Sequence, residues 1–170
     1  MISFNIGQAI FNFRVAGVCI HDGHVLVQRS VADDFWFLPG GRVEMMESSE
    51  AAIKREMREE LKLESDVQVA RLLWVVENLF HDDTDGAPNH EIGFYYQVNF
   101  DDHPALYDTS KALVATEDTG LYADQPMTFA LRWLPLDSLD DTLIYPTFLQ
   151  KGLQNLPTSV QHIVETDSDR

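Results

Sequence analysis

Cysteine and positive charge are scarce in this 170-residue sequence, and long apolar runs are missing. The single cysteine, Cys19, cannot form a disulfide within the chain, which favours a reducing compartment. No run approaches the roughly 18 apolar residues of a membrane span, and residues 1–5 lack the basic and apolar segments of a signal peptide. We therefore expect a cytoplasmic protein without a membrane span.

The charge balance is strongly acidic. Twelve Lys and Arg residues stand against 28 Asp and Glu residues, which gives a net charge of −16. A charge of this sign repels polymeric nucleic acid and anionic membranes, so neither is expected as a partner. A small phosphorylated substrate remains compatible, because divalent cations neutralise phosphate at a binding site. Most of these carboxylates are expected only to keep the protein soluble.

Size and patterning predict one domain over residues 1–170, made mostly of strands. A chain of this length that is 45% hydrophobic can bury roughly 70% of its unfolded surface, and it shows neither an internal repeat nor a linker. Strands are predicted over residues 13–20 and 25–29 as a hairpin with an Asp-Gly turn, over 67–80 as one or two strands, over 90–100 and over 128–134. A short helix is expected over residues 146–153.

Two segments fall outside this pattern. Residues 101–127 show few signals beyond a helical turn at 111–115, and so long a connection is usually functional or mobile. We interpret it as a candidate lid or dimer contact. From about residue 157 onward we expect a tail, with a frayed polar end.

The most informative stretch is residues 41–63, GRVEMMESSEAAIKREMREELKL. Glu56, Glu59 and Glu60 stand at i, i+3 and i+4, so on a helix their charges point into one small volume and repel unless a cation sits among them. An apolar stripe recurs every four residues along the neighbouring edge, at Ile53, Met57 and Leu61. One edge of this helix is therefore expected to pack inward while the adjacent edge holds acid.

The helix has a clear beginning. Ser48 or Ser49 can cap it, and Glu50 suits the positive end of the helix dipole. The preceding Leu-Pro-Gly-Gly at residues 38–41 must be a tight loop, whose glycines let the backbone approach a bound group closely. A carbonyl in this loop is a candidate metal ligand, and we assign that role to Gly41.

These residues resemble the Nudix box, the signature of the Nudix hydrolases, which are MutT-like pyrophosphohydrolases. The matching positions are Gly41, Glu47, Arg55, Glu56, Glu59, Glu60 and Leu63. One position departs, since the family usually has Gly where this chain has Lys62, and a left-handed turn costs Lys on the order of 1 kcal/mol. The departure puts the shape of the helix end in question, and not the carboxylates.

The resemblance implies an α/β fold in which a mixed β-sheet is sandwiched between helices. It also implies that Glu56, Glu59 and Glu60 bind metal, with one of them as the alternative general base. Carboxylate oxygens favour Mg²⁺ or Mn²⁺, and such ions lower the pKa of bound water and draw charge off phosphoryl oxygens. In the family, the residues that match Arg55 and Glu47 pair and orient these carboxylates. The alternative for Arg55 is a simple ion pair with Glu59.

Family members often recruit a further carboxylate from outside the box. Glu117, in the unassigned segment, is the candidate catalytic residue for this role, and Glu91 at the start of a strand is its competitor. Glu44 belongs to the loop, where a solvated role is as reasonable as a metal contact. The acidic stretch at residues 81–86 fails as a calcium loop, because His81 and Ile92 would fall on its first and last ligand positions.

The resulting hypothesis is a Mg²⁺-dependent or Mn²⁺-dependent hydrolase that cleaves the pyrophosphate bond of a nucleoside diphosphate linked to another moiety. The alternative is a Nudix-fold module that binds a nucleotide without cleaving it. The subgroup marks for ADP-ribose, dinucleoside polyphosphates and coenzyme A are absent, so the sequence does not identify the substrate. Aromatic residues such as Trp36, Phe80 and Tyr95 are candidates for stacking on a base. Family members commonly pair, which suggests a homodimer.

Overall fold

Extended segments of alternating burial place most of the chain in two sheets. The computed structural model describes residues 1–31, 33–82, 85–117 and 127–169, with the backbone alone at 113–117 and 127. The larger sheet follows the order β1 (Ser3–Ile6), β2 (Ala9–Val18), β7 (Pro88–Asn99), β6 (Gln68–His81) and β10 (Gln161–Thr166), with β5 (Gly40–Arg42) also paired to β2. Strand β2 runs parallel to β7 and β6 parallel to β10, while the other pairings are antiparallel, so this sheet is mixed.

The smaller sheet is antiparallel. Its order is β3 (Ile20–His21), β4 (His24–Ser30), β9 (Met127–Pro135) and β8 (Leu113–Glu117). The chain passes from the larger sheet to the smaller one at Cys19, directly after β2. The predicted hairpin therefore forms only between the two-residue β3 and β4, because the longer β2 belongs to the other sheet.

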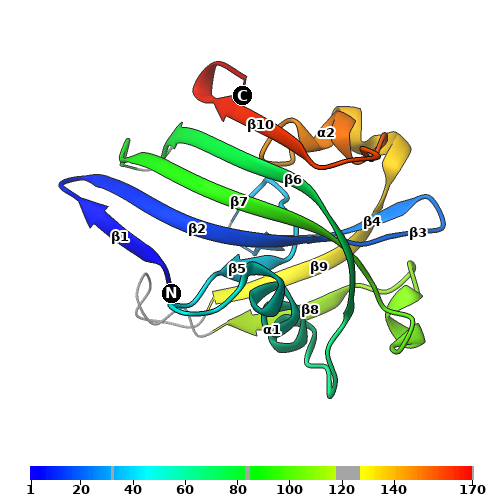
Figure 1. Ribbon diagram of the computed structural model, residues 1–170. Coiled ribbons are helices and arrows are strands. Elements are labelled where there is room, and N and C mark those ends of the chain that lie inside the picture. Colours follow the sequence, from blue (N-terminus) through cyan, green and yellow to red (C-terminus); the bar gives the residue numbers. More distant parts are fainter. Residues whose placement is uncertain (32, 83–84, 118–126, 170) are drawn as a thin grey trace.

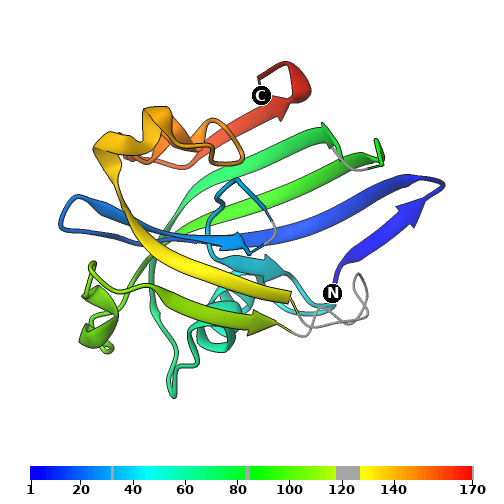
Figure 2. The same ribbon diagram turned by 180° about the vertical axis from the view of Figure 1, so that it is seen from behind.

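Helices lie on both sides of the larger sheet (Figures 1 and 2). Helix α1 (Ser49–Leu61) packs with Val15 of β2, whereas α2 (Leu149–Gly152) and the 3-10 helix η2 (Leu136–Asp141) pack with its neighbour Ala16. Successive strand residues point to opposite faces, so α1 and α2 cover opposite sides of the sheet. This arrangement confirms the expected sandwich. The remaining 3-10 helices are η1 (Pro104–Tyr107) and η3 (Asp167–Asp169).

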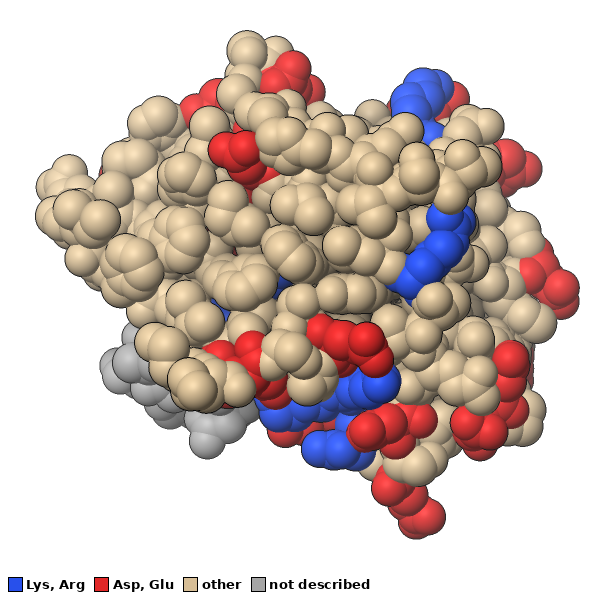
Figure 3. Space-filling view, in the orientation of Figure 1, with Lys and Arg blue, Asp and Glu red and all other residues tan. Residues whose placement is uncertain are grey.

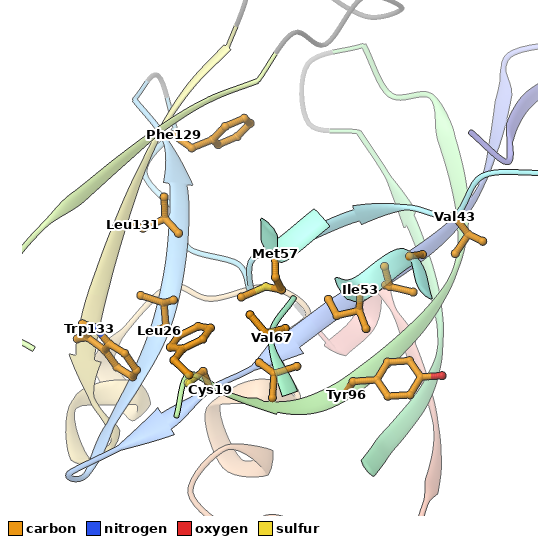
Figure 4. Close-up of a cluster of buried hydrophobic side chains, with 14 residues drawn as sticks. Cys19, Leu26, Val43, Ile53, Met57, Val67, Tyr96, Phe129, Leu131 and Trp133 are labelled. Atoms are coloured by element: carbon orange, nitrogen blue, oxygen red, sulfur yellow. The ribbon is translucent and has the colours of Figure 1, made fainter. Parts of the chain in front are cut away.

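The inward edge of α1 joins the two sheets through one apolar cluster. Figure 4 shows Ile53 and Met57 of α1 among buried side chains from both sheets, including Leu26, Leu131 and Tyr96. Both α1 residues are fully buried, as their four-residue spacing predicted. Each such side chain contributes roughly 1.5–3 kcal/mol through burial, so this cluster fixes α1 and the acidic edge beside it.

Two expectations from the sequence were wrong. The chain at residues 161–166 is not a frayed tail but strand β10, because it pairs with β6 and because the buried Glu165 accepts hydrogen bonds from the backbone N–H groups of Thr147 and Phe148. The helical turn at 111–115 is instead the start of strand β8, which pairs with β9. Residues 118–126 lie outside the described chain, so the lid at 101–127 stays a prediction.

The remaining secondary-structure predictions agree with the structure. Residues 67–80 form a single long strand, β6, and the expected strands at 90–100 and 128–134 correspond to β7 and β9. The helix expected over 146–153 is present but shorter, as α2. No helix in the described part of the chain is long and apolar enough to cross a membrane.

Candidate active site

Both ends of α1 are fixed by local hydrogen bonds. The side chain of Ser48 caps the first turn by accepting a hydrogen bond from the backbone N–H of Ala51 at 3.2 Å. At the other end Lys62 adopts the left-handed conformation, with φ 54° and ψ 46°, and the N–H of Leu63 donates to the carbonyl of Arg58 at 2.9 Å. Lys62 thus forms the same turn that a glycine would form, and the departure from the family pattern leaves the helix end intact.

Arg55 is the centre of the acidic edge. Its Nε and Nη2 donate to the two carboxylate oxygens of Glu47, both at 2.9 Å, and Nη2 also donates to the carbonyl of Arg42 at 3.0 Å. Its Nη1 lies 2.7 Å from Oε1 of Glu56 and 3.4 Å from Oε2 of Glu59. One guanidinium therefore orders three carboxylates and a loop, which is far more than the single ion pair with Glu59 that was the alternative.

These contacts change the acidity of both members of the main pair. The hydrogen bonds from Arg55 hold the pKa of Glu47 below its usual value, and the backbone N–H of Glu44 adds to the effect. The same hydrogen bonds from Glu47, with smaller effects of Glu56, raise the pKa of Arg55 above its usual value. Both groups are therefore charged near neutral pH, and the bidentate pair holds the guanidinium in one orientation.

Glu56 lies directly against Gly41. It is 7% exposed, and a Cβ atom added to Gly41 would stand 2.4 Å from its carboxylate. Only glycine leaves room for this contact. Gly40 has φ +142°, and a Cβ atom there would stand 2.2 Å from the carbonyl oxygen of Val15. The glycine pair therefore lets the loop pass close to the helix, as the sequence suggested, and Gly41 is paired with Val15 in the β5–β2 ladder.

Glu60 turns toward a different partner. Its Oε2 accepts a hydrogen bond from the backbone N–H of Gly40, and its Oε1 accepts one from Nε2 of Gln28 on β4, both at 3.0 Å. Glu60 is 4% exposed, whereas the side chain of Glu59 is 58% exposed. The three carboxylates thus differ in setting: Glu56 and Glu59 share Arg55, and Glu60 binds the loop.

The donor set fits a hard divalent cation in its chemistry. Glu56 and Glu60 are buried carboxylates on either side of the Gly40–Gly41 turn, and Arg55 contacts three acids with a single positive charge. Buried negative charge in excess is costly without a cation. In the described residues, however, no three His, Cys, Asp or Glu groups stand close enough to hold an ion as they are. A bound ion therefore requires side-chain movement, and the exposed Glu59 has the room for it.

A cavity of about 370 Å³ opens beside this loop. It begins at Leu38, two residues before Gly40, and lies on the face of the larger sheet that carries Ala16. Its aromatic lining consists of Phe35, Phe37, Phe80, Tyr95 and Tyr145, and its polar lining includes Arg14, Asp33, Asn78, His81, Asp82 and Glu91. Rings with a few polar groups suit a planar ligand of nucleoside size.

The structure places the other candidates as follows. Glu91 lines the cavity, and Glu44 contacts the terminal amino group of Met1 on the surface. The backbone of Glu117 ends strand β8, but its side chain lies outside the described part, so its role remains a prediction. Of the aromatic candidates, Phe80 and Tyr95 line the cavity, whereas Trp36 stacks on Arg29.

The sequence gave no signal for Gln28 or Arg14. Gln28 is 2% exposed and reaches Glu60 from a strand 32 residues earlier, and its backbone pairs with Phe37 of the cavity wall. Arg14 donates from Nη2 to the carbonyl of Leu38 at 3.1 Å and lies 5.5 Å from the ring of Phe37. Both contacts cross between elements, and only a chemically odd residue inside an apolar strand could have pointed to them.

Comparison with solved structures agrees with this geometry. A MutT NUDIX hydrolase from Burkholderia pseudomallei matches with a TM-score of 0.52 and 24% identity, covering 85% of this chain and 96% of that one. A MutT protein from Bacillus halodurans matches with a TM-score of 0.58 and 14% identity, covering 94% and 93%. A NUDIX hydrolase from Nitrosomonas europaea gives 0.53 and 13%, covering 92% and 79%. At these identities the likeness shows the fold.

Sequence comparison is specific at the level of the family. No curated protein sequence matches the chain. The family model of the NUDIX domain, however, matches residues 12–152, which include the whole acidic helix, the glycine loop and the cavity. The match confirms the resemblance that the box motif indicated. The chain therefore belongs to the NUDIX family.

Proposed function

We propose that this protein hydrolyses the pyrophosphate bond of a nucleoside diphosphate linked to another moiety, with Mg²⁺ or Mn²⁺ as cofactor. The observation that carries the proposal is the arrangement of Arg55, which orders Glu47, Glu56 and Glu59 beside a glycine loop that opens into an aromatic cavity. A helix needed only for stability has no use for buried acids at these positions, because each costs desolvation energy.

Glu56, Glu59, Glu60 and the backbone at Gly41 are the groups that would hold the cation. When bound, a divalent cation neutralises the diphosphate and lowers the pKa of a coordinated water molecule. The protein contributes orientation: Arg55 fixes Glu56, and Gln28 with the Gly40 N–H fixes Glu60. Preorganised carboxylates of this kind need no rearrangement at the moment of reaction.

Glu59 is our first candidate for the group that accepts the proton from the attacking water. Its side chain is the most exposed of the three, and Arg55 contacts it only at 3.4 Å. A general base must reach water and exchange its proton with solvent. Glu91 on the cavity wall and Glu117 are the alternatives.

The cavity is our candidate for the nucleoside site. A base can stack on Phe35, Phe37 or Phe80, while Arg14 brings positive charge to the wall nearest the loop. The diphosphate would then extend past Leu38 toward Gly40. Two structural neighbours bear the names ADP-ribose pyrophosphatase and UDP-X diphosphatase, and both substrate types belong in the assay panel.

The deciding experiment is Glu59→Gln, tested with Mg²⁺ and Mn²⁺ on ADP-ribose, nucleotide sugars, nucleoside triphosphates and dinucleoside polyphosphates. We expect turnover to fall at least a hundredfold, the lower range for loss of a general base. Glu50→Gln is the matched control, since Glu50 also sits on α1, is 56% exposed against 58%, and pairs with a cation four residues away. Full activity of Glu59→Gln would refute the assignment.

The second candidate is a module that binds a nucleotide without cleaving it. It is favoured by one observation, the engagement of Glu60 with Gln28 and Gly40, which leaves the carboxylates short of a ready three-ligand site among the described residues. Saturable binding of a nucleoside diphosphate, with no product released from any member of the panel with either metal, would select this alternative.

A further inference from the structure

One face of the larger sheet is only partly covered. Residues 11, 13 and 15 of β2 point to the side on which α1 lies, and Val15 is fully buried beneath that helix. Toward β1 the same face continues without a helix over it (Figure 1). We call this part the open sheet face and define it by two rows of paired residues that cross the strands.

The first row of the open sheet face consists of Phe4, Phe11, His90 and Leu79, which are register partners on β1, β2, β7 and β6. The second consists of Phe13, Ile92, Glu77 and Val164, on β2, β7, β6 and β10. In the first row the rings of Phe4 and Phe11 stack at 5.0 Å, and the ring of His90 follows at 5.7 Å. The face is therefore apolar and continuous across five strands.

Several of these side chains are exposed to an unusual degree. Phe4 is 50% exposed and Val164 54%, and Ile6, on the same side of β1 as Phe4, is 71% exposed. Single exposed apolar residues are ordinary, but a contiguous group that spans a sheet marks a surface that another molecule covers. The cavity is not affected, because its sheet residues Asn78 and Glu91 alternate with Leu79 and His90 and so lie on the opposite face.

Charge distinguishes this face from the rest of the molecule. The chain carries a net charge of −16, yet the one carboxylate in the two rows, Glu77, is paired with Nε2 of His162 at 2.8 Å. Figure 3 shows this side as a broad uncharged area, with the acidic and basic side chains gathered at its margins and below it. Two copies of so acidic a chain repel each other through most surfaces, but not through this one.

We propose that the open sheet face binds a second copy of this chain, sheet against sheet, in a two-fold dimer. A basic partner would select the acidic surfaces rather than the uncharged one, and an anionic membrane would be repelled by the net charge. An identical copy is complementary here, because a two-fold axis brings each row against its equivalent without opposing like charges. The contact lies on the sheet rather than at residues 101–127, and α1 and the cavity stay accessible.

The test is the mass of the protein in solution, measured by light scattering during size exclusion and by sedimentation over a range of concentrations. We expect the full chain to have twice its 19.4 kDa mass. The double variant Ile6→Glu with Val164→Glu brings four carboxylates into the interface and should give the monomer mass. Val31→Glu is the matched control, because Val31 is 69% exposed and lies off this face, so it should remain dimeric.

Salt dependence provides a second readout. Because the two copies repel each other outside an apolar contact, added NaCl should increase the dimer fraction by screening that repulsion. A contact held by opposite charges would weaken instead. A monomeric wild type at every concentration, or a double variant that dimerises as the wild type does while its circular dichroism is native, would overturn the proposal. Neither result depends on hydrolytic activity.

Discussion

Replacement of Arg55 by Met tests whether one guanidinium holds the acidic edge of α1 together. The change keeps much of the side-chain volume but removes every hydrogen bond to Glu47, Glu56 and the carbonyl of Arg42. The side chains of Glu47 and Glu56 are only 16% and 10% exposed, so water replaces the lost partner poorly. Breaking a buried pair in this way costs about 3–5 kcal/mol, and the residual exposure places our expectation at about 3 kcal/mol.

The effect should depend on pH in a definite direction. The pKa of Glu47 in the folded protein lies below its usual value of 4.5, so the stability that the pair provides is present above 4.5 and is lost as the pH falls through the folded value. The difference in the free energy of unfolding between wild type and Arg55→Met should therefore be constant near neutral pH. It should shrink below about pH 4.5, where protonation of Glu47 removes the pair in the wild type as well.

Urea denaturation at a series of pH values measures both quantities. Arg58→Met is the matched control on the same helix, because Arg58 pairs with Asp66 at the surface, where both side chains are more than 40% exposed. Such surface pairs contribute about 0–1 kcal/mol. If Arg55→Met destabilises the protein no more than Arg58→Met at neutral pH, the network around Arg55 does not support the fold as argued here.

Two further predictions follow from buried groups. Gln28→Leu removes the amide that holds Glu60 and should weaken Mn²⁺ binding, measured by calorimetry or electron paramagnetic resonance, by about 10- to 100-fold, whereas Gln97→Leu, which loses a bond to Arg71 away from α1, should not; equal affinities would show that Gln28 does not position Glu60. Burial raises the pKa of the Cys19 thiol to about 12, with a further contribution from Asp101, so a thiol reagent near pH 8 should label the protein only after unfolding, and rapid labelling of the native state would contradict this.

The acidic helix was predictable because its signals are local. The cap at Ser48, the apolar repeat at Ile53 and Met57 and the pairing of Arg55 with Glu47 all depend on residues within one or two turns, or on one loop next to the helix. Lys62 shows the limit of this reasoning. Its type argues against a left-handed turn, yet the turn forms, because two backbone hydrogen bonds at the helix end outweigh a strain of about 1 kcal/mol.

The misjudged elements are those that depend on distant partners. Residues 161–166 are polar and look frayed in isolation, but pairing with β6 and the burial of Glu165 against the start of α2 order them. Residues 113–117 gave only a weak helical signal, and their strand exists because β9 lies beside them. Strand propensity is weak on its own, since a strand is stabilised by neighbours that can be far away in sequence.

By itself, the sequence determined the family, the sandwich class and the spacing of the acids, because the box compresses its information into 23 neighbouring residues. Only the tertiary structure decided how those acids are divided, with Glu56 and Glu59 on Arg55 and Glu60 on Gln28 and Gly40. It likewise decided which face of the larger sheet forms the cavity and which stays open. The reason is physical: helical spacing fixes the direction of a side chain, but its hydrogen-bond partner comes from whichever strand the fold brings alongside.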